Sequence, residues 1–228
     1  MLFRSDTVIF TVVEAALCVL LVKRARVPGK EVSYPYQGRW SLVGGLVDIT
    51  RDKSIEAAAL RRLWEKTHVS SPYLEQLQSF GNGTRDPRKW SATVAYFALM
   101  SCEGVELIRG PKVDDVRWCP VDEALKLKLA FDHDLVLRTG IDRLRAKVEY
   151  TSIPANLLPT EFTLPELQQI YEIVLGRPLD KSSFRKRTLA VDFIEEVPRM
   201  REGRSRPAQL YRIKAGRTHV VFPRRFYV

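Results

Sequence analysis

The chain has 228 residues, of which 45% are hydrophobic and 28% are charged. The length is comfortable for two domains, and the composition of a globular protein excludes a disordered chain. The formal net charge is +10, and residues 177–228 hold 14 lysines and arginines against 5 acidic residues. Because nearly all the excess positive charge lies in this last quarter, its partner is expected to be a polyanion, either nucleic acid or an anionic surface. A basic but solvated surface is the alternative.

The cysteines and the longest apolar stretch both favour a cytoplasmic protein. Cys18, Cys102 and Cys119 lie far apart and form no CxxC pair, which suits reduced, buried thiols better than disulfides or a zinc site. Residues 8–22 are mostly apolar, but Glu14 interrupts them. They are therefore predicted to be two strands and not a signal peptide or a membrane span. We expect no metal site, no membrane partner and a cytoplasmic location.

Residues 1–150 are predicted to form one mixed α/β domain. Apolar and β-branched runs indicate strands at residues 7–13, 17–23, 39–43, 74–80, 92–100 and 116–119, the third ending at Gly44-Gly45. Composition and apolar spacing predict helices over residues 54–67, 121–125 and 132–149, with Ser54 and Asp132 as N-caps. The turn-rich residues 26–37 and 81–89 are expected to be loops.

Residues 151–228 are predicted to form a second, smaller domain. Two prolines and a lack of periodicity place the boundary in residues 150–159. Thr163, with Glu166 three residues later, forms a capping box that opens a helix over residues 163–174, and Gly176 breaks it. A helix over residues 180–191 and strands at residues 193–197 and 208–213 follow. A helix, a short turn, a basic helix and a hairpin are the pattern of a winged helix-turn-helix domain.

The order of the basic elements indicates DNA binding. Hydrogen-bond donors crowd the N-terminal half of the second helix, where recognition helices meet base edges and phosphates. Arginines surround the glycine of the hairpin, and an arginine-rich tip suits a minor groove. The DNA-contact candidates are Lys181, Ser182, Ser183, Arg185, Lys186, Arg187, Arg201, Arg204 and Arg206. Phe184, Leu189 and Val191 are expected to face the core. An RNA-binding or protein-interaction module is the alternative.

Gly44-Gly45, the loop after them and the helix around Arg61 resemble the Nudix box. That motif has a glycine, a Glu six positions later, and then, after seven residues, Arg-Glu-apolar-x-Glu-Glu-x-Gly-apolar. The positions that match are Arg61, Leu63 and Glu65. The departures are Lys53 and Arg62 in place of Glu, Lys66 in place of the last Glu, His68 in place of Gly, and Val43 where a proline is usual.

The departures at positions 62 and 66 change the chemistry of the motif. These positions are four apart and lie on one face of a helix. In the enzymes this face presents carboxylates to magnesium, which prefers oxygen ligands and negative charge. Two cations there repel magnesium and can hold a diphosphate without a metal. Glu65 can pair with Arg61 in a structural role. We therefore predict no catalytic residues and no efficient metal-dependent hydrolysis.

A Nudix-like domain followed by a winged helix is similar to the NrtR family of bacterial regulators of NAD metabolism. Residues 39–45, 85–88, 130–133, 184–187 and 206–211 add to the resemblance. It implies an α/β Nudix-like sandwich with a mixed sheet between helices, followed by a winged helix-turn-helix domain. It also implies a homodimer that represses genes of NAD synthesis or salvage. ADP-ribose or a related nucleotide would be an effector, not a cofactor, and would release the operator DNA.

An effector of this kind needs cations for its phosphates and an aromatic ring for its base. The phosphate candidates are Arg39, Arg62, Lys66, Arg85 and Arg88, and the base candidates are Trp40 and Phe131. As alternatives, Trp40 is a core residue, Arg85 and Arg88 brace their loop through Asp86, and His133 is a packed residue at a helix start. Two other functions stay open: a regulator that responds to a sugar, and an active ADP-ribose pyrophosphatase.

Overall fold

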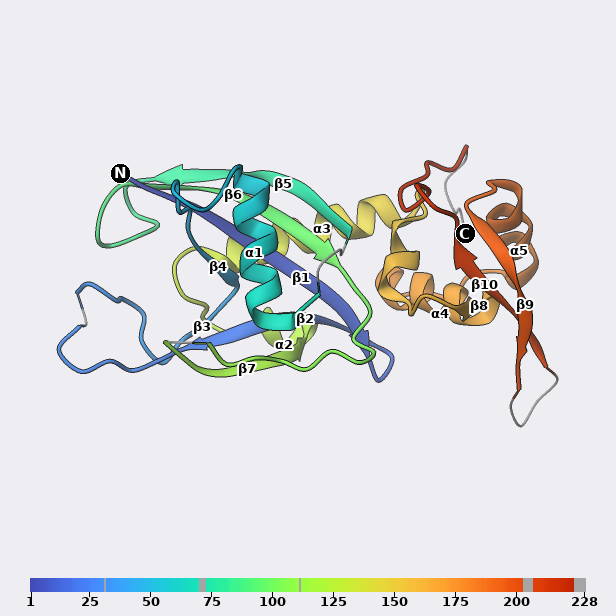
Figure 1. Cartoon of the computed structure of the whole chain (residues 1–228), viewed down its shortest axis with the longest axis horizontal. Coiled ribbons are helices and arrows are strands. Elements are labelled where there is room, and N and C mark those ends of the chain that lie inside the picture. Colours follow the sequence, from blue (N-terminus) through green and yellow to red (C-terminus); the bar gives the residue numbers. More distant parts are fainter. Residues whose placement is uncertain (31, 70–72, 111, 203–206, 224–228) are drawn as a thin grey trace.

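The computed structural model describes residues 1–30, 32–69, 73–110, 112–202 and 207–223. A larger N-terminal α/β domain and a smaller C-terminal domain lie end to end (Figure 1). Arg204 and Arg206, two of the DNA-contact candidates, lie outside the described residues.

A mixed seven-stranded sheet forms the centre of the N-terminal domain. β1 runs parallel to β6 and antiparallel to β2 and β4. The path is β3-β2-β1-β6-β5, with β4 beside β1 and β7 beside β2. The strands are β1 (Leu2–Val13), β2 (Ala16–Arg24), β3 (Trp40–Ser41), β4 (Val43–Leu46), β5 (Tyr73–Asn82), β6 (Ser91–Leu99) and β7 (Val113–Pro120).

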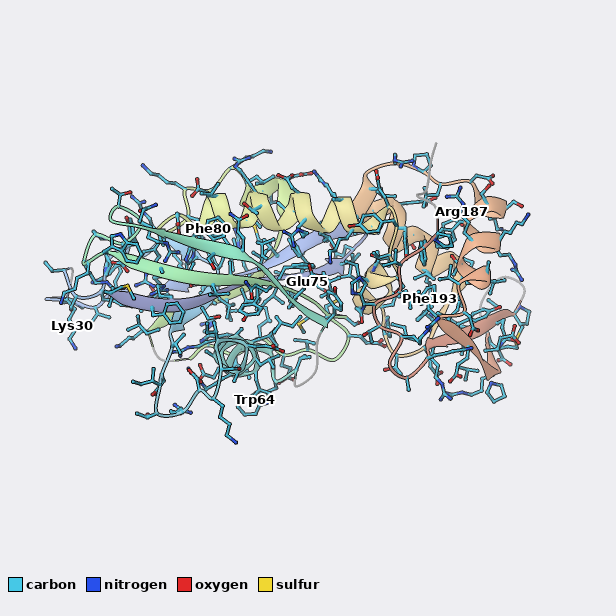
Figure 2. All side chains as sticks on the ribbon, turned by 90° about the horizontal axis from the view of Figure 1, so that it is seen from above. Lys30, Trp64, Glu75, Phe80, Arg187 and Phe193 are labelled. Carbon is cyan, nitrogen blue, oxygen red and sulfur yellow. The ribbon has the colours of Figure 1, made fainter. Side chains whose placement is uncertain are left out.

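Helices cover both faces of this sheet, with α1 on one side and α3 on the other (Figure 2). The helices are α1 (Ile55–Thr67), α2 (Val121–Ala124) and α3 (His133–Val148). Successive residues of a strand face opposite sides, and β1 follows this rule. Val8 and Phe10 share a core cluster with Val136 of α3, whereas Ile9 shares another with Leu63 of α1. The expected sandwich with its sheet between helices is confirmed.

Two strand boundaries near the N-terminus and one cap differ from the prediction, and β7 and β9 (Ile194–Arg201) both run longer than expected. β1 begins at Leu2, five residues earlier than expected, because parallel pairing with β6 buries Arg4 and Asp6. The strand expected at residues 39–43 is two strands, since β3 pairs with β2 and β4 pairs with β1. Gly44 lies inside β4, where a Cβ atom would stand 2.1 Å from a carboxylate oxygen of Asp6. Asp132 precedes α3, but its side chain makes no cap hydrogen bond.

The C-terminal domain has the expected winged-helix arrangement. Its elements are the 3-10 helix η1 (Ile153–Leu157), β8 (Phe162–Thr163), α4 (Leu164–Leu175), α5 (Lys181–Ala190), β9 (Ile194–Arg201) and β10 (Ala208–Ile213). The strands form a sheet in the order β8-β10-β9. The capping box of Thr163 and Glu166 opens α4, and Gly176 closes it with a φ of 68°. Asp180 caps α5 by accepting from the Ser183 N–H at 2.8 Å.

The junction between the domains is packed and does not form an open linker. Ile153 and Leu157 of η1 are buried in the same cluster as Val148 of α3 and Tyr171 of α4. The hydrophobic core is therefore continuous from one domain to the other. Among the helices within the described ranges, none combines the length and the apolar character that a bilayer crossing requires.

Candidate functional site

A cavity of about 820 Å³ opens between β4, the C-terminal half of α1 and the loops around Tyr34 and Arg109. One glutamate, Glu65, contributes to its wall. The cationic side chains in the wall are Arg4, Arg24, Arg62, Lys66, Arg88, Arg109 and Lys112. Among the residues that the structure describes, seven cations against one carboxylate favour an anion with several charges, such as a diphosphate.

Three buried donors in the cavity wall lack a hydrogen-bond acceptor within the described part of the chain. They are Nε of Arg4, Nε of Arg62 and Nε2 of His133. The Nδ1 atom of His133 accepts from the Leu42 N–H at 3.0 Å, so the neutral ring carries its proton on Nε2. A buried donor left without an acceptor costs about 1–3 kcal/mol. A ligand that brings acceptors to this wall would recover part of that cost.

Arg62 and Lys66 stand where the sequence predicted, on the face of α1 that borders the cavity. Arg62 lies across Gly45, where a Cβ atom would be 2.9 Å from the guanidinium. Its Nη1 donates to Glu65 at 3.1 Å. Burial lowers the pKa of Lys66, and neighbouring Arg62 also lowers it. An ammonium that has lost water in this way gains from an anionic partner.

Glu65 is held by two arginines, and Arg61 has a second partner that the sequence did not reveal. Arg61 donates to Glu65 at 3.0 Å and to both carboxylate oxygens of Asp52 at 2.7 Å. These hydrogen bonds from Arg61 hold the pKa of Asp52 well below its usual range. Asp52 directly precedes Lys53, the residue aligned with the motif's first Glu. An acidic residue is therefore present, one position away, and it braces α1.

Arg88 borders the cavity, but Arg85 does not. Arg88 donates to both oxygens of buried Asp86, at 2.6 and 2.9 Å. Arg88 therefore braces its loop through Asp86 and also lies in the cavity wall. Arg85 is 3% exposed and pairs with Asp132 at 2.8 Å and Asp6 at 3.3 Å. The partner expected for Arg85 was Asp86, and that expectation is wrong. The guanidinium of Arg85 is buried, is engaged by two carboxylates and lies outside the cavity wall, so it is not placed to bind a phosphate there.

Trp40 and Phe131, the two aromatic residues that the sequence suggested, are outside the described cavity wall. Trp40 packs against the core, with the Arg117 guanidinium 4.6 Å from its ring. The Phe131 ring has the guanidinium groups of Arg4 and Arg24 each 5.0 Å away. Phe131 therefore makes cation–π contacts with two of the cavity arginines and does not line the cavity itself.

Trp64 lines the described part of the cavity, with its ring 4.6 Å from that of His68, and Tyr34 lines it as well. The Arg24 guanidinium lies 4.1 Å from the Tyr34 ring, and the Tyr34 hydroxyl donates to the Lys112 carbonyl at 2.8 Å. The signal in the sequence was weak, because Tyr34 lies in a loop with prolines and glycines. Arg39 is outside the cavity wall, with its guanidinium 5.3 Å from the Tyr36 ring.

The basic helix α5 presents its donors outward, at the end of the molecule away from the N-terminal domain (Figure 2). The exposed candidates are Lys181, Ser182, Ser183, Arg185 and Lys186, and Arg187 is partly buried. Phe184 is buried as expected, but Leu189 is 42% exposed. The expectation for Leu189 is wrong because Thr188, four residues after Phe184, takes the inward position.

Comparison with known proteins identifies the family. Residues 2–139 match the NUDIX domain, and residues 154–213 match the NrtR DNA-binding winged helix domain. The chain is 42% identical over 223 residues to the ADPR responsive transcriptional repressor NtrR of Acinetobacter baylyi, covering 98% of this chain and 86% of that protein. This chain belongs to the NrtR family.

Solved structures of another NrtR resemble both domains. NrtR of Shewanella oneidensis in complex with a 27mer DNA has a TM-score of 0.89 and 40% identity, with all of both chains covered. The Nudix domain of that protein in complex with ADP ribose has a TM-score of 0.56 and 43% identity. The second match covers 63% of this chain and 88% of the domain.

In this member of the NrtR family the described part of the wing is tied to the scaffold helix α4. Arg201 of β9 pairs with Glu166, and its Nη2 donates to the Glu161 carbonyl at 3.1 Å. Arg199 pairs with the Glu161 carboxylate. Arg201 can reach a phosphate only by giving up or sharing Glu166, so it is a weaker DNA candidate than the exposed cations of α5.

Proposed function

We propose that this chain is a transcriptional repressor of genes of NAD synthesis or salvage, and that ADP-ribose bound in the cavity controls its hold on operator DNA. The observation that carries the proposal is a cavity with seven cations and one carboxylate, built on a Nudix frame and joined to a domain with an exposed basic helix. A diphosphate with two ribose rings matches such a wall, and duplex DNA matches α5. ADP-ribose is an effector here, not a cofactor.

Loss of hydrolase activity is part of this proposal. Arg62 and Lys66 replace two carboxylates of the motif, and the remaining Glu65 is engaged by Arg61 and Arg62. A wall of this charge disfavours Mg²⁺. Incubation with ADP-ribose and either Mg²⁺ or Mn²⁺ is expected to leave the nucleotide intact. Turnover at an ordinary enzymatic rate of about 1 s⁻¹ or more would support the pyrophosphatase alternative.

The direct test is a gel shift with duplex DNA from upstream of NAD genes, titrated with ADP-ribose, alongside calorimetry. We expect ADP-ribose to bind and to change the DNA affinity by about 5–150-fold. Heat with a pentose but with no adenine nucleotide would favour the sugar-responsive alternative.

A homodimer is also proposed, because two-fold operators require paired recognition helices. A repressor of this kind acts in the cytoplasm, where the bacterial DNA lies.

Substitutions at Tyr34 test whether the ring of this residue receives the base. Tyr34→Ala is expected to weaken ADP-ribose binding by about 5–150-fold, because base stacking on an aromatic ring contributes about 1–3 kcal/mol. Tyr34→Phe keeps the ring and loses only the bond to the Lys112 carbonyl, so it should retain most of the affinity. Calorimetry with ADP-ribose measures both. Equal losses in the two variants would assign the effect to the hydroxyl and reject stacking.

Arg185 tests the role of α5. Its side chain is exposed, so Arg185→Ala is expected to weaken operator binding by about 1–3 kcal/mol without changing the melting temperature or the affinity for ADP-ribose. Arg145→Ala, at an exposed position of α3 in the N-terminal domain, removes the same charge from a different helix and is the control. Unchanged DNA affinity in Arg185→Ala, or an equal loss in Arg145→Ala, would reject a specific contact.

A further inference from the structure

The chain that follows β10 returns to the junction between the two domains. We call residues 214–222 the C-terminal strap. Lys214 donates its N–H to the Phe193 carbonyl at 3.0 Å, and Arg217 donates to the Val191 carbonyl at 3.2 Å. Val191 is the C-cap of α5. The strap therefore begins against the C-terminal end of the basic helix.

The strap then pairs with the residues that join α3 to η1. Val221 forms an antiparallel bridge with Thr151. The Ser152 N–H donates to the Val220 carbonyl at 2.9 Å, and the Val220 N–H donates to Ser152 Oγ at 2.8 Å. Asn156 Nδ2 donates to the Thr218 carbonyl at 3.0 Å. The junction lies between residues 2–139 and 154–213, and the strap lies after them, so the family matches leave both out.

The strap also contacts the sheet of the N-terminal domain. The His219 ring meets the ring of Tyr73 on β5 edge to face, with 6.0 Å between the centroids. The Tyr73 hydroxyl donates to the Glu75 carboxylate, which also accepts hydrogen bonds from Lys147 and Arg143 of α3. Glu75, labelled in Figure 2, is a residue of β5, so these ion pairs join β5 to α3. The strap is thus joined to α3 both at the junction and through β5.

The opposite end of α3 lies at the cavity. His133, its first residue, has its buried Nε2 in the cavity wall without a hydrogen-bond acceptor among the described residues. Asp132, which precedes it, holds Arg85. A ligand that engages His133 acts on one end of a 16-residue helix. The other end is tied by the Thr151 hydroxyl, which donates to the Lys147 carbonyl at 2.7 Å, to the junction that bonds the strap. A packed helix transmits a shift along its axis because a close-packed core does not absorb it.

We propose that the C-terminal strap couples the effector cavity to the DNA-binding helix, through α3, the junction and the C-terminal end of α5. The inference rests on the proposed function, because it assigns a route for the effect of ADP-ribose on DNA binding. The strap does not contact the cavity, and its contact with α5 is at the end away from the exposed cations at Lys181 and Arg185. Weakening it should therefore change the coupling between the two ligands more than the affinity for either.

The experiment uses the full chain and two variants that loosen the strap. Ser152→Ala with Asn156→Ala removes the side-chain hydrogen bonds that hold it at the junction, and His219→Ala removes the contact with β5. Thr218→Ala is the matched control, because its side chain is exposed and its carbonyl makes the bond to Asn156. For each protein, calorimetry gives the affinity for ADP-ribose. Fluorescence anisotropy gives the affinity for a duplex selected by the wild type, with and without saturating ADP-ribose.

In the wild type and in Thr218→Ala we expect ADP-ribose to change the DNA affinity by about 5–150-fold. In the junction variant, Ser152→Ala with Asn156→Ala, we expect the ratio of DNA affinities without and with ADP-ribose to fall to about 2-fold or less. In His219→Ala we expect a ratio between that value and the wild-type ratio. The affinity of each variant for either ligand alone should stay within about 3-fold of the wild type. An unchanged ratio in both variants overturns the proposal. So does a loss of DNA affinity that is equal with and without ADP-ribose, since the strap would then only support the fold of the C-terminal domain. If the wild type binds ADP-ribose and DNA without any coupling, the proposed function itself fails.

His219→Ala keeps the test decisive if the junction variant unfolds. His219 is exposed, so its removal leaves the buried core intact, and a melting curve identifies any variant that has lost its fold. A ratio in His219→Ala equal to that of the wild type, when the junction variant is unfolded, overturns the proposal.

Discussion

Arg62→Glu combined with Lys66→Glu is expected to weaken ADP-ribose binding by about 100-fold or more. Each charge-assisted hydrogen bond contributes about 1.5–3 kcal/mol, and the double variant replaces two cations of the wall by carboxylates. The same change restores the carboxylate face of the Nudix motif. Binding of Mn²⁺ or Mg²⁺ should therefore appear where the native wall disfavours it. Calorimetry with ADP-ribose, and then with each metal ion, measures both effects.

The control for this variant must carry the same change in net charge. Lys126→Glu with Lys128→Glu provides it, because both side chains are exposed and neither borders the cavity. We expect this control to bind ADP-ribose within about 3-fold of the native protein, since charges on the surface are screened by salt. If the two double variants bind ADP-ribose equally, Arg62 and Lys66 do not contact the phosphates.

The sequence was sufficient to find this pair because the relation between them is local. Positions 62 and 66 share a helix face by the geometry of the α-helix, and the Gly-Gly pair and the helix around Arg61 lie close together in the chain. The winged-helix domain was predictable for the same reason, since the capping box, the glycine turn and the basic helix are consecutive.

The rest of the cavity could not be predicted, because its residues are brought together by strand pairing. Arg4 reaches the wall because β1 pairs with β4, which places it opposite Leu46. Lys112 is more than seventy residues from Tyr34, and the Tyr34 hydroxyl bonds to its carbonyl. Phe131 was chosen as a base ligand because it is aromatic and adjoins a recognisable stretch. Composition could not show that its ring lies behind two arginines.

Asp6 is the buried charge on which the wall depends. It is 0% exposed, and its carboxylate lies 3.3 Å from Arg4, 3.3 Å from Arg85 and 3.7 Å from Nε2 of His133. Removing one partner of a buried ion pair costs about 3–5 kcal/mol, because an uncompensated charge stays behind. Asp6→Ala is expected to lower the free energy of unfolding by this amount, as measured by urea denaturation. Ser5→Ala is the neighbouring control, and its buried hydroxyl has no described partner, so little stability should be lost.

The same carboxylate should make stability depend on pH in the acid range. Burial alone would raise the pKa of Asp6, but Arg4, His133 and Arg85 together hold it well below the ordinary value of 3.8. The folded state therefore favours the ionised form. The stability that Asp6 contributes is complete above the ordinary value, and it is lost as the pH falls through the lower value of the folded protein. Asp6→Asn keeps the shape and removes the titration, so below pH 4 its stability should fall less steeply than that of the native protein. Parallel acid limbs in urea denaturation would show that Asp6 titrates alike in the folded and unfolded chains. Such a result would contradict the role of the Asp6 carboxylate as the charge that holds Arg4 and His133 at the cavity.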